Sequence, residues 1–377
     1  MRIYFDHAAS SPVRKQVIDF FKSENFIDLY NPSSVHFEGQ KTRAKINDAR
    51  DLISSLLECN EENIVFTSSG TESCNYVINH ALHTEDIENI IYLPTEHSAV
   101  LDTIFSKSVK RLPCQMNKNG EIDLLNLDSI LASLSGKTLV CAMLINNETG
   151  IIQPIIDISN VCQKYGALLF SDMIQSIGKL NTVECLKFCD YASFAAHKIG
   201  GLPGTGIAYL KEQKKVYKDF FGGEQEFGRR AGTENVSGII AFGIAMEACI
   251  DASVYESDNI THLYEHLTEG IRSISKEIII PSIDGNKENS ITTLIFPGLK
   301  SENLIIGMDM NNIAISAGAA CSSGKIGGSH VLKSLNYDTN QVNGAIRVSF
   351  GWNNTIDQVD YFFKVLNNLL KGMNFKF

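Results

Sequence analysis

The chain contains, at residues 191–201, the stretch Tyr191-Ala192-Ser193-Phe194-Ala195-Ala196-His197-Lys198-Ile199-Gly200-Gly201. A short apolar run bounded by a glycine turn is typical of a buried strand. A second run of this kind, Ala167–Phe170, is followed by Asp172 and Gln175. We therefore expect polar side chains at the ends of two buried strands, with Lys198 and Asp172 placed to serve one site.

Similar apolar runs alternate with helical segments through the first two thirds of the chain. Short strands separated by helices indicate a mainly parallel sheet that is buried on both faces. The predicted strands are Asn63–Thr67, Asn89–Pro94, Val109–Pro113, Thr138–Leu144, Ala167–Asp172, Tyr191–Ala195 and Gly206–Leu210. The predicted helices lie at about 13–22, 38–57, 72–83, 97–107, 123–134 and 155–165.

The pattern changes after Gly232. A long helical region is expected from Asn235 to Lys276, followed by strands near Ser290–Phe296 and Ala345–Ser349 and by helices near 301–310 and 356–371. A chain of 377 residues usually divides into more than one domain. We predict an α/β fold with a large domain over residues 13–254 and a smaller α+β domain formed by residues 1–12 and 255–377.

The overall composition excludes some functions. A net charge of −10 argues against sequence-independent nucleic-acid binding. No window approaches the roughly 20 apolar residues that span a bilayer, and the N-terminus reads as a strand rather than a signal peptide. The nine cysteines are scattered, with no spacing typical of a metal site, which indicates reduced thiols and a cytoplasmic protein.

Three further segments place polar groups after predicted strands. Ile64–Ser73 reads as a strand, a small-residue turn and a helix start, which suits an anion site at a helix N-terminus or a plain helix cap. His97 lies at a strand-to-helix junction, where it can handle protons or only cap the helix. Asn146–Gly150 follows another strand. Because open α/β sheets bind ligands at the carboxyl ends of their strands, we expect these groups to share one site.

Seven motifs occur in the order found in cysteine desulfurases, which are pyridoxal-phosphate enzymes of fold type I and similar to class-V aminotransferases. The chain resembles this family from Tyr4 to about Trp352. The motifs are Asp6-His7-Ala8-Ala9-Ser10, Asn31-Pro32-Ser33-Ser34, Thr95-Glu96-His97, Asn146-Asn147-Glu148-Thr149-Gly150, His197-Lys198, Arg229-Arg230-Ala231-Gly232-Thr233 and Ser316-Ala317-Gly318-Ala319-Ala320-Cys321.

The resemblance implies a set of residues that bind pyridoxal 5'-phosphate. Lys198 would form the Schiff base with the aldehyde, Asp172 would pair with the ring nitrogen, and Gln175 would bond the ring hydroxyl. His97 would stack on the ring and act as an acid/base catalyst. The phosphate would be held by Gly70, Thr71 and His197, and by Thr233 of the neighbouring subunit of a homodimer.

The resemblance also implies a substrate site and a sulfur carrier. Asn147, Arg347 and Asn31 would bind the substrate, with Arg347 clamping its carboxylate. Cys321 would be the catalytic cysteine that receives the sulfur. Eleven of the fourteen residues from Ser316 to Ser329 are Gly, Ala or Ser, so the sequence predicts a mobile, exposed loop around Cys321.

The expected reaction converts L-cysteine to L-alanine and leaves a persulfide on Cys321 for a sulfur-acceptor protein. A selenocysteine lyase or another β-lyase of the same fold, and a non-catalytic scaffold, are the alternatives. The chain departs from the family's usual pattern at Ala195, where a phosphate-binding Ser is common, at Phe227, where an Arg is common, at Leu202-Pro203, and at Gly327-Gly328. Loss of one hydroxyl at residue 195 would weaken phosphate binding by ~1 kcal/mol.

Overall fold

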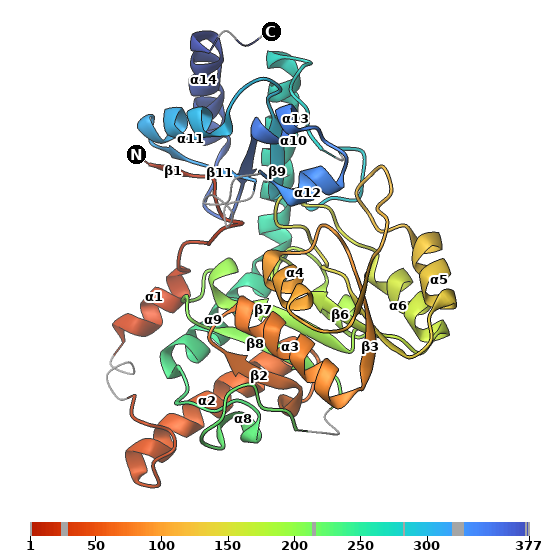
Figure 1. The fold of residues 1–377 in the computed structure, drawn as a ribbon. Helices are drawn as coiled ribbons and strands as arrows, with labels where there is room; N and C mark the ends of the chain where they lie inside the picture. Colours follow the sequence, from red (N-terminus) through yellow and green to blue (C-terminus); the bar gives the residue numbers. More distant parts are fainter. Residues whose placement is uncertain are drawn as a thin grey trace.

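The computed structural model describes residues 2–23, 29–212, 216–281, 283–318, 328–373 and 375. Its largest sheet has seven strands in the order β2-β8-β7-β6-β5-β3-β4 (Figure 1). They are β2 (Ile64–Thr67), β3 (Ile87–Tyr92), β4 (Lys110–Pro113), β5 (Lys137–Cys141), β6 (Leu168–Asp172), β7 (Tyr191–Ala195) and β8 (Gly206–Leu210). The predicted strands are confirmed, and the pairs among β3 to β7 are all parallel. Only β8 runs antiparallel to its neighbours, β2 and β7.

Helices cover both faces of this sheet. Val65 packs on one face with α3 (Gly70–Thr84) and α4 (Ser98–Phe105). The next strand residue, Phe66, packs on the other face. There it joins α2 (Phe37–Leu56), α5 (Leu124–Ser133), α6 (Ile155–Lys164) and α9 (Val236–Asp251). Because successive strand residues face opposite sides, a continuous apolar strand fills two hydrophobic layers at once.

A second hydrophobic core lies at the other end of the molecule (Figure 1). It contains an antiparallel sheet in the order β11-β12-β9 and a parallel pair, β1-β10. The strands are β1 (Ile3–Tyr4), β9 (Ile291–Ile295), β10 (Ile313–Ala314), β11 (Ser316–Ala317) and β12 (Ala345–Ser349). The helices α10 (Ser253–Ile274), α11 (Ser301–Met310) and α14 (Ile356–Gly372) pack against it. The domain limits given from the sequence remain a prediction.

The helical region expected from Asn235 to Lys276 is two helices rather than one. It breaks at Ala252, and α9 and α10 are bent by 69° relative to one another. No single helix in the described part of the chain is long and apolar enough to cross a membrane, although this bent pair together meets that length and composition. The remaining helices are α1 (Lys15–Lys22), α7 (Thr182–Leu186), α8 (Gln225–Gly228), α12 (His330–Ser334) and α13 (Thr339–Asn343), with short 3-10 turns at Glu61–Asn63 and Ala196–Lys198.

Candidate active site

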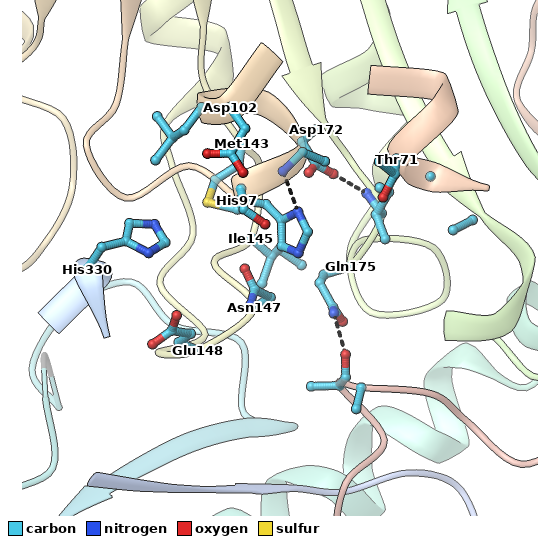
Figure 2. Close-up of a pocket in the computed structure, with 18 of the residues that line it drawn as sticks. Thr71, His97, Asp102, Met143, Ile145, Asn147, Glu148, Asp172, Gln175 and His330 are labelled. Atoms are coloured by element: carbon cyan, nitrogen blue, oxygen red, sulfur yellow. Dashed lines mark hydrogen bonds between the residues drawn. The ribbon is translucent and has the colours of Figure 1, made fainter. Parts of the chain in front are cut away.

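A cavity of about 750 Å³ lies at the carboxyl ends of the parallel strands, where the sequence placed it (Figure 2). It also reaches β12 of the second core through Arg347. Nine of the twelve residues predicted for the site line this one cavity: Gly70, Thr71, His97, Asn147, Asp172, Gln175, His197, Lys198 and Arg347.

Lys198 follows β7 on a short 3-10 turn, Ala196–Lys198. Its Nζ donates to the backbone carbonyl oxygens of Ala8 and Ala9, at 2.6 and 2.8 Å. These contacts come from the N-terminal segment, nearly 190 residues away in sequence. The amine is therefore held on the cavity wall by uncharged acceptors. These do not form an ion pair with it, so it can react with a ligand.

Asp172 is the last residue of β6 and is only 6% exposed. Its Oδ1 accepts a hydrogen bond from the backbone N–H of Ile174 at 3.0 Å. Burial raises the pKa of Asp172 to about 6, and the positive charge of Lys198 offsets part of that effect. The negative charge of this buried carboxylate is only partly offset by its neighbours, so the carboxylate favours a cationic partner.

His97 is the N-cap of α4, where its Nδ1 accepts the backbone N–H of Ala99 at 3.0 Å (Figure 2). That contact places the proton of the neutral ring on Nε2. Burial, and then the charge of Lys198, lower the pKa of His97 to about 4. The same two causes lower the pKa of His197 to about 4. Both rings are therefore neutral at physiological pH.

Gly70 and Thr71 open α3, and Ser69 caps the helix by accepting the backbone N–H of Glu72 at 3.1 Å. A side chain at residue 70 would place its Cβ 2.4 Å from Cδ1 of Ile174. A larger residue at this position would therefore require the Ile174 side chain to move. The arrangement presents the N–H groups of a helix N-terminus to the cavity, which suits an anion.

Arg347 lies on β12 and is 2% exposed. Its Nη1 donates to the backbone oxygen of Asn147 and its Nη2 pairs with Oδ1 of Asp6, both at 2.8 Å. Its Nε has no hydrogen-bond partner within the described ranges. Asp6 and Asn147 thus fix the guanidinium while one of its donors remains for a bound anion.

Two of the predicted residues that the structure describes, Asn31 and Thr233, do not line this cavity. Asn31 is exposed, and its Oδ1 accepts the backbone N–H of Ser33 at 2.9 Å, as in a local turn. Thr233 is exposed and does not line the cavity of its own chain. Cys321 and Gly327 lie outside the described residues. The roles given to Asn31, Thr233 and Cys321 remain predictions.

The cavity lining includes ionisable residues that were not singled out from the sequence, among them Glu148 and His330. Glu148 lines the cavity and accepts a hydrogen bond from Ser329 Oγ, and burial raises its pKa. His330 enters from α12, with Nε2 at 2.8 Å from the backbone oxygen of Glu96 (Figure 2). Glu148 is part of the Asn146–Gly150 motif, which was a usable signal. His330 follows no predicted strand, so its position gave none.

Comparison with known proteins places the chain in a family. It matches the class-V aminotransferases over residues 3–362. It is 32% identical to the cysteine desulfurase IscS of Dictyoglomus turgidum, with 98% of this chain and 95% of that protein aligned. It is 33% identical to the putative cysteine desulfurase IscS 1 of Bacillus subtilis, with 99% of each aligned.

Solved structures agree with this assignment. A NifS-like protein from Rickettsia africae is 28% identical and superimposes with a TM-score of 0.89, covering 98% of this chain and all of that one. A structure of SspA in complex with cysteine is 27% identical, with a TM-score of 0.80 over 94% of this chain and all of that one. The mainly parallel sheet, the cavity at its strand ends and the full-length sequence match lead to one conclusion: the chain belongs to the cysteine desulfurase family, within the class-V aminotransferases.

Proposed function

We propose that this chain is a pyridoxal-phosphate-dependent cysteine desulfurase. It converts L-cysteine to L-alanine and passes the sulfur, carried as a persulfide on Cys321, to an acceptor protein. The observation that carries the proposal is the meeting of Lys198, Asp172 and Arg347 on one cavity, in a chain that aligns with cysteine desulfurases over nearly its whole length. The cysteine bound to the related SspA supports the choice of substrate.

The residues present fit pyridoxal 5'-phosphate, the cofactor on which enzymes of this family depend. The buried Asp172 carboxylate accepts one backbone N–H and otherwise lies 4.0 Å from the Sγ of Cys74. A protonated ring nitrogen would supply the positive charge that this carboxylate lacks. Lys198 offers an amine for the aldehyde, and the start of α3 offers N–H groups for the phosphate.

Lys198 would hold the cofactor through its aldehyde, Asp172 would pair with the ring nitrogen, Gln175 would bond the ring oxygen, and His97 would cover the ring. Gly70, Thr71, His197 and the partner's Thr233 would hold the phosphate. When bound, the cofactor supplies an electron-withdrawing ring that weakens the bonds at the substrate's α- and β-carbons.

The chain's own residues bind the substrate and move its protons. Arg347 and Asn147 orient the carboxylate, because Arg347 keeps an unused donor beside its fixed contacts. Lys198 Nζ moves the proton of the α-carbon, and His97 holds a proton on Nε2. The Cys321 thiolate attacks the substrate sulfur, so that an S–S bond forms as the C–S bond breaks. The electron pair of the C–S bond stays on the substrate, the β-carbon takes up a proton to become the methyl group of alanine, and the α-carbon regains the proton that Lys198 moved.

We also propose that two copies form a homodimer in the cytoplasm. Thr233 is exposed, and the segment before it carries Phe221 and Phe227, which are 88% and 58% exposed. Exposed aromatic side chains close in sequence to a predicted trans-acting residue support a subunit interface. The eight described cysteines are all free, which fits a reducing compartment.

The test is to incubate the purified holoenzyme with L-cysteine, then measure alanine and map protein persulfides by alkylation and mass spectrometry. Wild type should form alanine and a persulfide at Cys321. Cys321→Ser should retain the cofactor but lose the persulfide and turnover. Cys59→Ser is the matched control, because burial raises the pKa of the Cys59 thiol to about 12 and makes it a poor nucleophile.

Two outcomes would replace the proposal. Alanine formation that continues at the wild-type rate in Cys321→Ser would favour a selenocysteine lyase or another β-lyase, and selenocysteine would then be tested as substrate. Absence of both a visible cofactor band and any turnover would favour a non-catalytic scaffold.

A further inference from the structure

The side-chain amide of Gln175 makes two hydrogen bonds, donating one and accepting the other. Its Nε2 donates to the backbone oxygen of Ala8 at 2.9 Å (Figure 2), and its Oε1 accepts from Nζ of Lys179 at 3.0 Å. The side chain lines the cavity and is 5% exposed. The same Ala8 oxygen accepts from Lys198. Gln175 therefore lies between a lysine outside the cavity and the lysine that the proposed function places on the cofactor.

Lys179 is directed inward by a turn that requires glycine. Gly178 has a φ of +73°, and a Cβ there would lie 2.1 Å from Sγ of Cys249. The turn places Lys179 four residues after Gln175 with its amine against the amide oxygen. Burial lowers the pKa of Lys179, Glu288 and Cys249 act in the opposite direction, and Arg347 adds to the lowering. The amine is thus a half-buried donor that bonds the Gln175 amide oxygen.

The polarity of the contact decides which end of the amide faces each neighbour. The oxygen and nitrogen ends of a glutamine amide have nearly the same shape, so packing alone does not select one orientation. A lysine ammonium is only a donor and the Ala8 carbonyl oxygen only an acceptor, so together they select the orientation with Oε1 toward Lys179 and Nε2 toward Ala8. The two N–H groups of Nε2 then face away from Lys179, and Ala8 takes one of them.

We propose that Lys179 is a positioning residue that orients the Gln175 amide so that its second N–H faces the ring oxygen of the cofactor. This inference rests on the proposed function, in which Gln175 bonds that oxygen. With the amide reversed, its one acceptor, Oε1, would face two other acceptors, the ring oxygen and the Ala8 carbonyl oxygen. Both contacts would be repulsive.

The experiment compares holoenzyme variants by the rate of cofactor loss after dilution and by the position of the cofactor's visible absorption band. Lys179→Met should lose cofactor roughly tenfold faster, as expected for one hydrogen bond to a charged or polar oxygen, and should shift the band. Lys287→Met is the matched control. Its Nζ is also buried and also faces Glu288, but has no hydrogen-bond partner in the described parts of the chain.

Lys179→Arg should restore most of the wild-type band, because it retains a buried cationic donor. Gln175→Ala should lose cofactor faster, and adding Lys179→Met to it should change the rate little further, since the lysine acts through the amide. Should Lys179→Met fail to fold, Lys179→Gln replaces it, because its amide can donate or accept and no longer selects one orientation.

The possible failures are distinguishable. If Lys179→Met and Lys287→Met show the same rate of cofactor loss and the same absorption band, Lys179 has no positioning role. The same conclusion follows if the double variant loses cofactor at a rate that multiplies the separate effects of Lys179→Met and Gln175→Ala. If Gln175→Ala alone leaves both the rate and the band unchanged, Gln175 does not contact the cofactor and the proposed function itself must be revised at this residue.

Discussion

His97 and Asp172 lie on the same cavity, and burial shifts their pKa values in opposite directions, to about 4 and about 6. At neutral pH the imidazole is uncharged and the carboxyl is mainly ionised. The two side chains therefore differ in role even before a ligand binds. A neutral ring can cover an aromatic cofactor without repelling the Lys198 charge, while an anionic carboxylate draws a cationic ring nitrogen toward the floor of the cavity.

At the same scale, Arg347 is the residue that should control substrate capture. Its Nε is unpartnered among the described residues, and its other contacts to Asp6 and Asn147 are fixed. Arg347→Leu should lower kcat/KM for cysteine by about 30-fold or more, because losing a buried partner of a charge typically costs ~2–5 kcal/mol. Steady-state kinetics on holoenzyme would measure this. Cofactor content should stay unchanged, and a variant that lost cofactor but kept kcat/KM would contradict the assignment.

His80 gives a separate test of how burial controls ionisation, away from the cavity. The ring is 2% exposed on α3, and burial lowers its pKa to about 4. The unfolded chain, with a pKa near 6.5, takes up the proton first as pH falls. The stability associated with neutral His80 is therefore present above pH 6.5 and is lost between pH 6.5 and about 4.

We expect His80→Leu to gain ~3 kcal/mol relative to wild type between pH 7 and pH 4, at about 1.4 kcal/mol per pH unit. Denaturant unfolding of both proteins at several pH values would measure the difference. His262→Leu is the control, because His262 is exposed on α10. A difference for His80→Leu that stayed constant with pH would contradict the prediction.

At the scale of elements, the sequence predicted the positions of the strands better than their directions in the sheet. Tyr191–Ala195 and Gly206–Leu210 match β7 and β8 in extent, because continuous apolar runs report burial directly. Burial is the same for parallel and antiparallel strands, so the reversed direction of β8 left no trace in the pattern. The break at Ala252 between α9 and α10 was also missed, since alanine favours a helix and neither Gly nor Pro marks the bend.

The same distinction explains the site. Asp172, His97 and Lys198 follow strands of one sheet, so their convergence could be predicted from strand ends alone. Ala8, Ala9 and His330 reach the cavity from segments far away in sequence, through tertiary packing. Local patterns carry no information about such contacts.

One short element is held by a buried ion pair. Glu226 and Phe227 of α8 have φ values of 50° and 56°, which is unusual for residues with side chains. The Glu226 carboxylate accepts from Nη2 of Arg50 at 2.7 and 2.8 Å and from the backbone N–H of Phe66 at 2.8 Å. This carboxylate therefore ties α8 to α2 and β2, and the surrounding contacts sustain the strained turn.

Glu226→Gln should destabilise the protein by ~3–5 kcal/mol, because it leaves the Arg50 guanidinium buried without its countercharge. Asp309→Asn is the control. It removes the partner of Arg2, but both of those side chains are more than half exposed, so the loss should be far smaller. Denaturant unfolding at one protein concentration would compare them. Equal losses would show that the buried pair does not hold α8.

At the scale of the whole molecule, the proposed dimer places Thr233 in the other subunit's site. Gly232, next to Thr233, donates its N–H to Oε1 of Gln225 in α8 at 3.1 Å. Phe227 of α8 and Thr233 therefore belong to two linked segments with exposed side chains, which form the proposed dimer surface. If that surface meets a second copy, each cavity takes Lys198 from one chain and Thr233 from the other.

Mixed dimers can separate this arrangement from one in which Thr233 serves its own chain. Lys198→Ala removes the reactive amine, and Thr233→Ala removes the predicted phosphate contact. When the two variants are co-expressed, a mixed dimer in the trans arrangement contains one intact site, with Lys198 from one chain and Thr233 from the other. Separated mixed dimers should then show about half of wild-type activity per subunit, because one of their two sites is intact. Desulfurase assays on tagged, separated mixed dimers would measure it. Activity equal to the average of the two parent variants would show that Thr233 does not act across the interface.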